Sequence, residues 1–229
     1  MTTICPIPSE TCVARAVARL LAGRLAIVPT DTVYGLAADI RSDEAVSAIF
    51  GLKGRGPQYP LQLLFSPASA AMLGAYGDLT VSASRFIREV GPGPWTVIVP
   101  ARPGWASPAL AGGATVGVRM PDHPLVHEVV ERLGAPLAAT SANPAGQPSP
   151  VTAQEAVTSL AGAAHDGHPS AWWVPIALDA GPTHHRLDST VIDCAVDPPQ
   201  ILREGAIDRS VVARILGVSD VQVVRSVRT

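Results

Sequence analysis

Hydrophobic and polar positions along the chain alternate between two periods, one typical of amphipathic helices and one of short buried strands. Apolar residues recur at helical spacing, as at Val46, Ile49 and Phe50, in segments that often begin at a serine or threonine and end at a glycine. These segments predict helices at residues 9–22, 42–52, 80–90, 123–133, 152–160 and 209–216. Short apolar runs predict strands at residues 25–28, 61–65, 95–99, 115–120, 136–139, 173–178, 190–194 and 200–202.

The order of these elements predicts an α/β fold. Strands joined by helices, with some strands adjacent along the chain, indicate three layers around a sheet of mixed direction. No linker is long enough to divide the chain, so we expect one domain over residues 1–217 and a tail over residues 218–229. The tail is expected to add a strand or to form a flap, and residues 163–175 are the least patterned stretch.

Composition narrows the class of protein. Of 229 residues, 47% are apolar and 16% are charged, which is enough to bury a sizeable core. The formal net charge of −2 gives no reason to expect strong non-specific binding to nucleic acid, so any weak RNA contact would need a local patch of arginines.

Targeting patterns are missing from the sequence. No window of about 18 apolar residues predicts a membrane helix, and residues 1–10 lack the pattern of a secretory signal. We therefore expect a cytoplasmic protein without membrane contact. Its three cysteines, Cys5, Cys12 and Cys194, contain no C-x-x-C pair and are expected to be free buried thiols.

Two residue types occur only once. Lys53 is the only lysine among 17 basic residues, and Asn143 is the only asparagine. Because lysine is a compact point charge and arginine a planar fork, we interpret Lys53 as performing a task that arginine cannot, with chance as the alternative. In the segment KGRG, residues 53–56, Lys53, Arg55 and the glycine backbone can surround a triphosphate. The alternative is an ordinary helix C-terminus. Since Lys53 follows a predicted helix, we expect it to contribute little to folding.

Further polar clusters stand where predicted strands end, which is where open α/β sheets bind ligands. The segment PTDTVYGL, residues 29–36, offers hydroxyls and a carboxylate on a turn, with a simple strand-to-strand turn as the alternative. Arg119 lies in an otherwise apolar strand, so it needs either a structural partner such as Asp122 or the carboxylate of a ligand. The clusters TSANPAGQPSP, LDSTVID and ILREGAI contribute Ser141, Asn143, Ser189, Thr190, Arg203 and Gly205 as candidate residues.

Several well-known motifs do not occur. The chain has no G-x-x-x-x-G-K-[ST] loop, no G-x-G-x-x-G fingerprint and no G-x-S-x-G elbow. His123 and His127 have the i, i+4 spacing of zinc ligands, but no third ligand at suitable spacing is apparent. We therefore expect no zinc, no protein-ligated metal site and no organic cofactor.

Together, the clusters resemble the YrdC-type threonylcarbamoyl-AMP synthase family. The matching motifs, in the family's order over residues 25–205, are PTDTVYGL, K-x-R, PGPWT, VGVRMPDHP, SAN followed by PSP, DSTV and LREG. The resemblance implies a YrdC-like fold, a twisted mixed β-sheet around a basic concave cavity, in a short form without a large C-terminal extension domain. It implies an enzyme, a nucleotidyltransferase, that forms threonylcarbamoyl-AMP and pyrophosphate from L-threonine, bicarbonate and ATP, with Mg²⁺ accompanying ATP. The product would pass to tRNA threonylcarbamoyl-transferase proteins for N6-threonylcarbamoyladenosine modification of tRNA.

The resemblance also assigns roles to residues. Lys53 and Arg55 would neutralise phosphate charge as catalytic residues. The threonine pocket would consist of Thr32, Arg119, the backbone of Ala139, and Ser189. The ATP site would consist of Arg55, Tyr59, Thr115, Ser141, Asn143, Ser149 and Arg203.

Two positions depart from the family pattern. Tyr59 stands where members often have lysine or asparagine before a proline, and Leu64 stands where some longer members have a polar residue, often histidine. Two alternatives therefore stay open. One is a non-catalytic paralogue that binds RNA or nucleotide, and the other is an enzyme that adenylates a different carbamate.

Overall fold

The computed structural model describes residues 2–6, 10–54, 56, 59–162, 176–219 and 221–224. Its α-helices are α1 (Glu10–Leu21), α2 (Asp43–Lys53), α3 (Val81–Val90), α4 (Pro124–Leu133), α5 (Ala153–Gly162) and α6 (Arg209–Leu216). Two 3-10 helices are η1 (Pro67–Ala75) and η2 (Pro108–Leu110). The strands are β1 (Thr3–Pro6), β2 (Ala26–Val28), β3 (Gly35–Asp39), β4 (Gln62–Leu64), β5 (Trp95–Pro100), β6 (Thr115–Arg119), β7 (Leu137–Ser141), β8 (Ile176–Asp179), β9 (Thr190–Asp193) and β10 (Gln200–Arg203).

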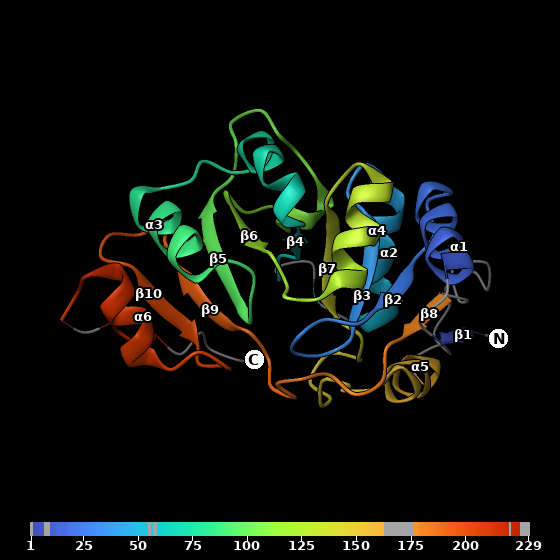
Figure 1. Cartoon of the computed structure of the whole chain (residues 1–229). Coiled ribbons are helices and arrows are strands. Elements are labelled where there is room, and N and C mark those ends of the chain that lie inside the picture. Colours follow the sequence, from blue (N-terminus) through green and yellow to red (C-terminus); the bar gives the residue numbers. More distant parts are fainter. Residues whose placement is uncertain are drawn as a thin grey trace.

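The strands form one mixed sheet in the order β1-β8-β2-β3-β7-β4-β6-β5-β9-β10. Neighbours β4 and β6 run parallel, as do β5 and β9, whereas β7 is antiparallel to both β3 and β4. Figure 1 shows the sheet extending from β1 and β8 at one end to β9 and β10 at the other. The predicted α/β fold with a mixed sheet is confirmed.

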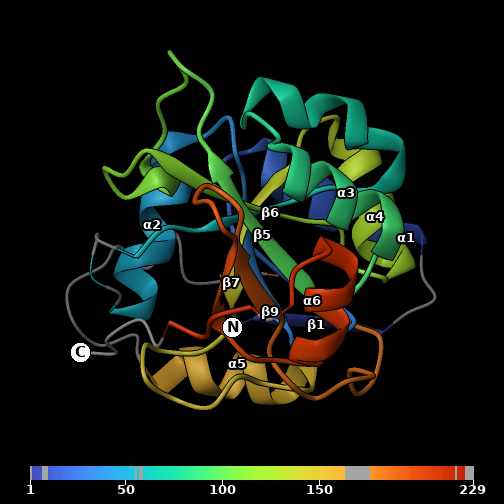
Figure 2. The same ribbon diagram turned by 90° about the vertical axis from the view of Figure 1, so that its left-hand side faces the viewer.

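Helices flank the sheet on both sides. Figure 2 shows α1, α3 and α4 on one side of the strands and α2 on the other. In β5, the buried Trp95 packs edge to face on Phe86 of α3, with ring centroids 6.0 Å apart. Because side chains alternate along a strand, Thr96 and Ile98 face the opposite side of the sheet. That side carries the cavity described below.

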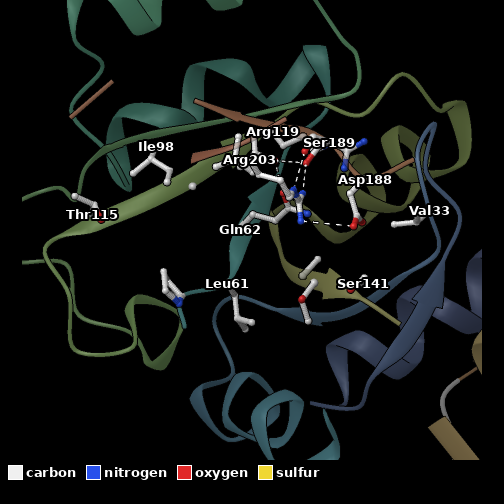
Figure 3. Close-up of a pocket in the computed structure, with 16 residues that line it drawn as sticks. Val33, Leu61, Gln62, Ile98, Thr115, Arg119, Ser141, Asp188, Ser189 and Arg203 are labelled. Carbon is white, nitrogen blue, oxygen red and sulfur yellow. Dashed lines mark hydrogen bonds and ion pairs between the residues drawn. The ribbon is translucent and has the colours of Figure 1, made fainter. Parts of the chain in front are cut away.

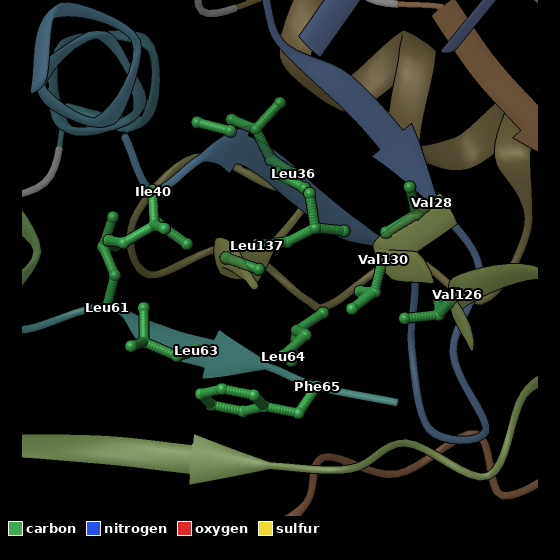
Figure 4. Packing of buried hydrophobic residues seen from close by; sticks show 14 of the residues in the cluster. Val28, Leu36, Ile40, Leu61, Leu63, Leu64, Phe65, Val126, Val130 and Leu137 are labelled. Carbon is green, nitrogen blue, oxygen red and sulfur yellow. The ribbon is translucent and has the colours of Figure 1, made fainter. Parts of the chain in front are cut away.

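The hydrophobic core joins the sheet to the helices that cover it. Figure 4 shows Val28, Leu36 and Leu137 of the strands gathered with Val126 and Val130 of α4. All five side chains are buried. Since burial of a side chain of this size contributes roughly 1.5–3 kcal/mol, the large apolar fraction of the sequence supports one continuous core.

Helix ends follow the predicted capping signals. The side-chain oxygens of Ser42 and Thr80 accept hydrogen bonds from the N–H groups of Ala45 and Ala83, which fixes the starts of α2 and α3. Gly217 ends α6 in the left-handed conformation at φ 72°. The expected starts at residues 42 and 80 and the expected stop after residue 216 are therefore confirmed.

Two strands were missed by the pattern. β3 reads GLAAD, which has weak strand propensity, yet it is buried and paired on both edges by β2 and β7. Tertiary pairing therefore overrides local preference. β1 ends in a proline and lies at the edge of the sheet, where a missing N–H is tolerated. Within the segment of residues 29–36, residues 29–34 form the turn that links the antiparallel strands β2 and β3, and β3 begins at Gly35.

The C-terminal tail adds a short pairing to the sheet. The N–H of Ile201 donates to the carbonyl of Gln222, and the N–H of Val224 donates to the carbonyl of Ile201, both at 2.9 Å. An isolated β-bridge between Ile201 and Val223 therefore places this part of the tail beside β10, without forming a full strand. Residues 163–175, including the predicted start of the strand at residue 173, lie outside the described residues.

The cysteines are buried and free, as predicted. Cys5, Cys12 and Cys194 form no disulfide. Burial raises the pKa of the Cys194 thiol to about 12. Among the helices in the described ranges, none has the length and apolar character needed to cross a bilayer.

Candidate functional site

A cavity of about 240 Å³ lies over the sheet face opposite α3 (Figure 3). The residues assigned above to the substrates that line it are Thr115, Arg119, Ala139, Ser141, Ser189 and Arg203. They come from β6, β7, β10 and the segment that leads into β9. Tertiary structure therefore joins motifs that are far apart in the sequence.

Strand periodicity explains the floor of the cavity. The alternate residues Thr115, Gly117 and Arg119 of β6 line it, whereas Val116 and Val118 between them are buried in the hydrophobic core. An arginine in an apolar strand is thus placed on the ligand-facing side of the sheet.

Arg119 pairs with Asp31 and not with Asp122. Its Nη2 lies 2.5 Å from Asp31 Oδ1 and donates to Thr32 Oγ1 at 2.9 Å. The proposed structural partner Asp122 is therefore wrong, because the turn between β2 and β3 brings Asp31 to the last residue of β6. Burial lowers the pKa of the Arg119 guanidinium, and the Asp31 carboxylate acts in the opposite direction.

This buried pair retains hydrogen-bonding capacity. Arg119 Nε and Asp31 Oδ2 are buried and have no hydrogen-bond partner among the described residues. Because buried polar atoms in proteins are nearly always satisfied, the arrangement fits a site that a polar ligand completes. The unpaired guanidinium nitrogen favours an anionic or carbonyl oxygen.

A directed chain of hydrogen bonds crosses the cavity. Arg203 Nη2 donates to Ser189 Oγ, and Arg203 Nε donates to the Ser189 carbonyl, both at 3.0 Å. Ser189 Oγ lies 2.9 Å from Thr96 Oγ1, which in turn donates to Gln62 Oε1 at 2.7 Å. Since the Thr96 hydroxyl has one hydrogen, Ser189 must be the donor in the contact between the two hydroxyls. Ser189 therefore presents a lone pair to the cavity and can accept from an N–H or O–H of a ligand.

Ser149 acts on the cavity through Asp188. Its hydroxyl donates to Asp188 Oδ1 at 3.0 Å, and Asp188 Oδ2 lies 3.8 Å from Arg203 Nη1. Asp188 lines the cavity, but Ser149 does not. Both charged side chains are about a third exposed, so their ion pair is a weak contact that a ligand can rearrange.

Lys53 has a structural position that the sequence did not predict. It is the last residue of α2, it is 3% exposed, and its ammonium donates to the main-chain carbonyls of Ser141 and Asn143. The Asn143 amide donates to the carbonyls of Pro144 and Gln147, at 3.1 and 2.6 Å. The premise that Lys53 has little core around it is wrong, because its side chain is buried. Its removal would leave buried carbonyls at the end of β7 without their charged donor.

The other assigned residues lie beside the cavity or outside the described residues. Thr32 contacts Arg119 directly but is not part of the lining. Tyr59 is partly buried and does not line the cavity, and Arg55 lies outside the described residues. Leu64 is 1% exposed in the hydrophobic core and is likewise not part of the lining.

The two histidines have local partners. His123 Nδ1 accepts from the N–H of Leu125 at 3.3 Å and caps α4, and His127 Nε2 lies 2.6 Å from the Pro121 carbonyl. Burial lowers the pKa of His123. Within the part of the chain that the structure describes, no three His, Cys, Asp or Glu side chains are grouped to hold a metal ion.

Sequence reasoning missed three residues that shape the cavity, Gln62, Thr96 and Asp188. Thr96 belongs to the motif PGPWT and Asp188 to the motif LDSTVID, so membership of these motifs could have identified both residues as candidates for the site. Gln62 stands in a short apolar run, and a single polar residue in that run was the signal available.

Comparison with known proteins gives a consistent result. The Sua5/YciO/YrdC family model, described as "Telomere recombination", matches residues 18–205. A protein of Bacillus subtilis (strain 168) named threonylcarbamoyl-AMP synthase is 35% identical over 206 residues, which are 90% of this chain and 56% of that protein. A relative in Mycobacterium tuberculosis (strain ATCC 25618 / H37Rv) is 34% identical over 206 residues, 90% of this chain and 89% of its own length.

Solved structures share the fold. The structure of Pyrococcus abyssi Sua5 complexed with L-threonine matches with a TM-score of 0.86 at 28% identity, over 97% of this chain and 62% of that one. The chain thus spans little more than half of the Bacillus relative and under two thirds of the Pyrococcus protein.

Proposed function

The chain belongs to the Sua5/YciO/YrdC family, and on that premise we propose that it is an L-threonylcarbamoyladenylate synthase. It would convert L-threonine, bicarbonate and ATP into threonylcarbamoyl-AMP and pyrophosphate. The observation that carries the proposal is that one cavity is lined by all of the residues Arg119, Ser189, Thr115, Ser141 and Arg203. The names of the relatives and the threonine complex of the Pyrococcus protein support it.

The amino-acid half of the substrate fits the Arg119 side of the cavity. The threonine carboxylate would accept from the Arg119 guanidinium, whose Nε has no partner among the described residues. The threonine nitrogen would donate to Ser189, which presents a lone pair because its own hydrogen is given to Thr96.

The nucleotide fits the side of the cavity that holds Thr115 and Ser141, and its phosphates would extend toward Arg203, which is hydrogen-bonded to Ser189. Pockets for larger ligands measure roughly 300–1,000 Å³, so ATP would extend from this cavity of about 240 Å³ into solvent. Mg²⁺ would accompany ATP and neutralise charge on the phosphate oxygens. The lining offers a hard oxygen donor for such an ion in the Asp188 carboxylate, and Arg203 would contact phosphate oxygens.

The chemistry needs positioning more than a protein nucleophile. The threonine nitrogen bonds to the carbon of carbon dioxide derived from bicarbonate and loses a proton, which gives a carbamate. A carbamate oxygen then bonds to the α-phosphorus, and the bond from that phosphorus to the bridging oxygen breaks as pyrophosphate leaves. Fixed cations and hydrogen-bond donors around such a reaction stabilise the transition state.

The cellular role follows from the product. An activated threonylcarbamoyl group would be used by tRNA threonylcarbamoyl-transferase proteins to make N6-threonylcarbamoyladenosine, and we expect the protein to work in the cytoplasm. A weak RNA contact is compatible with the net charge of −2 only through a local arginine patch.

The test is pyrophosphate release by the purified protein. Release should require ATP, Mg²⁺, bicarbonate and L-threonine together, and mass spectrometry should detect threonylcarbamoyl-AMP. Omission of each component in turn is the control. Equal release with serine, or without an amino acid, would overturn the threonine specificity and favour another carbamate. ATP binding without any release would favour the non-catalytic paralogue.

A further inference from the structure

The register of the central strands arranges the cavity floor in three rows. In β6, Arg119 and Thr115 mark the two outer rows, and Gly117 lies between them. Gln62 of β4 pairs with Gly117 on one side and with Ala139 of β7 on the other, so it belongs to the middle row. Rows two residues apart along a strand are separated by about 6.7 Å.

Gln62 gives the middle row its polar character. The other residues of this row that line the cavity are Gly117, Ala139 and Ile98, none of which has a polar side chain. The outer rows correspond to the two halves of the proposed substrate, with Arg119 on the amino-acid side and Thr115 on the nucleotide side. The middle row therefore lies where the two halves are joined.

Thr96 holds Gln62 in place across Gly117. Its hydroxyl donates to Gln62 Oε1 at 2.7 Å although the strands β4 and β5 are separated by β6. A Cβ at position 117 would lie 3.2 Å from Thr96 Cγ2 and 3.4 Å from Gln62 Cβ, so glycine leaves the room for this contact. The contact uses the amide oxygen of Gln62 as an acceptor. The amide nitrogen Nε2 is a donor and has no hydrogen-bond partner among the described residues.

We propose that Gln62 orients the carbamate of the reaction by donating a hydrogen bond from Nε2 to a carbamate oxygen. This inference rests on the proposed function. In N-carboxythreonine three bonds separate the carboxylate carbon from the carbamate carbon, with a summed length of about 4.3 Å. The carboxylate would lie on Arg119, and the middle row lies about 6.7 Å from the row of Arg119. When the oxygen atoms of the carboxylate and of the carbamate are added to this summed length, the carbamate reaches the middle row.

The hydrogen bond leaves the balance of the reaction unchanged. Gln62 gives up no proton and accepts none. Its amide fixes the carbamate so that the other oxygen forms the bond to the α-phosphorus, while the electron pair of the broken bond leaves with pyrophosphate. The chemistry of the partner is thus an anionic oxygen of the carbamate.

Two substitutions separate this role from a structural one. Gln62→Glu keeps the shape and the acceptor for Thr96, but it removes the donor and adds a negative charge facing an anion. Gln62→Met removes both the donor and the acceptor at nearly the same volume. If Gln62 only supported Thr96, Gln62→Glu would be the milder change; on our proposal it is the more damaging one. Gln200→Met, at the start of β10 and outside the cavity lining, is the matched control.

The measurements are pyrophosphate release at varied bicarbonate, calorimetric binding of L-threonine in carbonate-free buffer, and melting temperature. Since hydrogen bonds to charged groups are worth roughly 10- to 100-fold in affinity, Gln62→Met should raise the KM for bicarbonate by about that factor. Threonine affinity without bicarbonate should stay within about twofold, since neutral changes away from the contact have small effects. Gln62→Glu should lose more than Gln62→Met, and Gln200→Met should match the wild type.

The outcomes distinguish this inference from the proposed function. An active wild type whose Gln62→Met variant keeps its bicarbonate KM, or in which Gln62→Glu is the milder variant, overturns the role of Gln62 alone. An equal loss of threonine affinity without bicarbonate also overturns it, because it places the contact on the amino acid. A wild type that binds threonine but shows no bicarbonate-dependent release refutes the proposed function, and the carbamate contact with it.

Discussion

The buried pair of Arg119 and Asp31 gives a sharp prediction because it is both a structural contact and a proposed part of the site. The side chains are 2% and 4% exposed, with 2.5 Å between Nη2 and Oδ1. In Arg119→Met the Asp31 carboxylate stays buried without its cation. In Asp31→Asn the guanidinium stays buried without its anion. We expect either single substitution to destabilise the protein strongly, and the double substitution to recover most of the loss.

The magnitude follows from the cost of an unpaired buried charge. Breaking one partner of a buried pair costs about 3–5 kcal/mol, whereas replacing both by neutral groups is often close to neutral. Since about 1 kcal/mol changes the melting temperature of a chain of this size by roughly 2–4 °C, each single variant should melt roughly 6–20 °C lower. The coupling free energy in the double-mutant cycle should be at least about 1 kcal/mol.

The assay combines denaturant unfolding of all four proteins with pyrophosphate release at varied threonine. The folded double variant Asp31→Asn/Arg119→Met isolates the role in binding, and we expect its KM for threonine to rise while that for ATP changes little. Single effects that add up to the double effect within about 0.5 kcal/mol would refute the reasoning about the pair. A double variant with the threonine KM of the wild type would show that Arg119 acts in the ion pair alone.

Two other substitutions test how the cavity is held together. Lys53→Met removes the ammonium that the carbonyls of Ser141 and Asn143 accept from, so it should cost about 1–3 kcal/mol and lower the melting temperature by roughly 2–12 °C. An unchanged melting temperature with lost turnover would instead favour a direct phosphate contact. Gly205→Ala would place a Cβ 2.5 Å from the main-chain carbon of Ser189, so we expect the protein to lose about 1–3 kcal/mol of stability. We also expect it to lose threonine-dependent activity. A variant that melts and reacts like the wild type would contradict this.

The sequence predicted most elements because their signals are local. The caps at Ser42 and Thr80 and the stop at Gly217 are short-range hydrogen-bond patterns, and they lie where expected. β3 could not be predicted in this way, because GLAAD becomes a strand only through its pairing with β2 and β7.

In the site, too, some features could be predicted from local sequence and others depend on tertiary structure. Arg119 could be chosen from the sequence because a cation in an apolar run needs an anion, but the choice of Asp31 over Asp122 depends on how a distant turn folds back. The role of Gln62 depends on three strands in register, with a glycine between it and Thr96.

The sequence by itself determined the alternation of helices and strands, the apolar core and the set of polar motifs, because periodicity and capping act over a few residues. Only the tertiary structure decided which polar groups meet. Lys53 is the clearest case: the sequence singles it out as the only lysine, and only the fold shows that it is buried against the carbonyls of Ser141 and Asn143. Hydrogen bonds and ion pairs form between atoms a few ångströms apart, and the distances between segments far apart in the chain are set by the packing of the sheet.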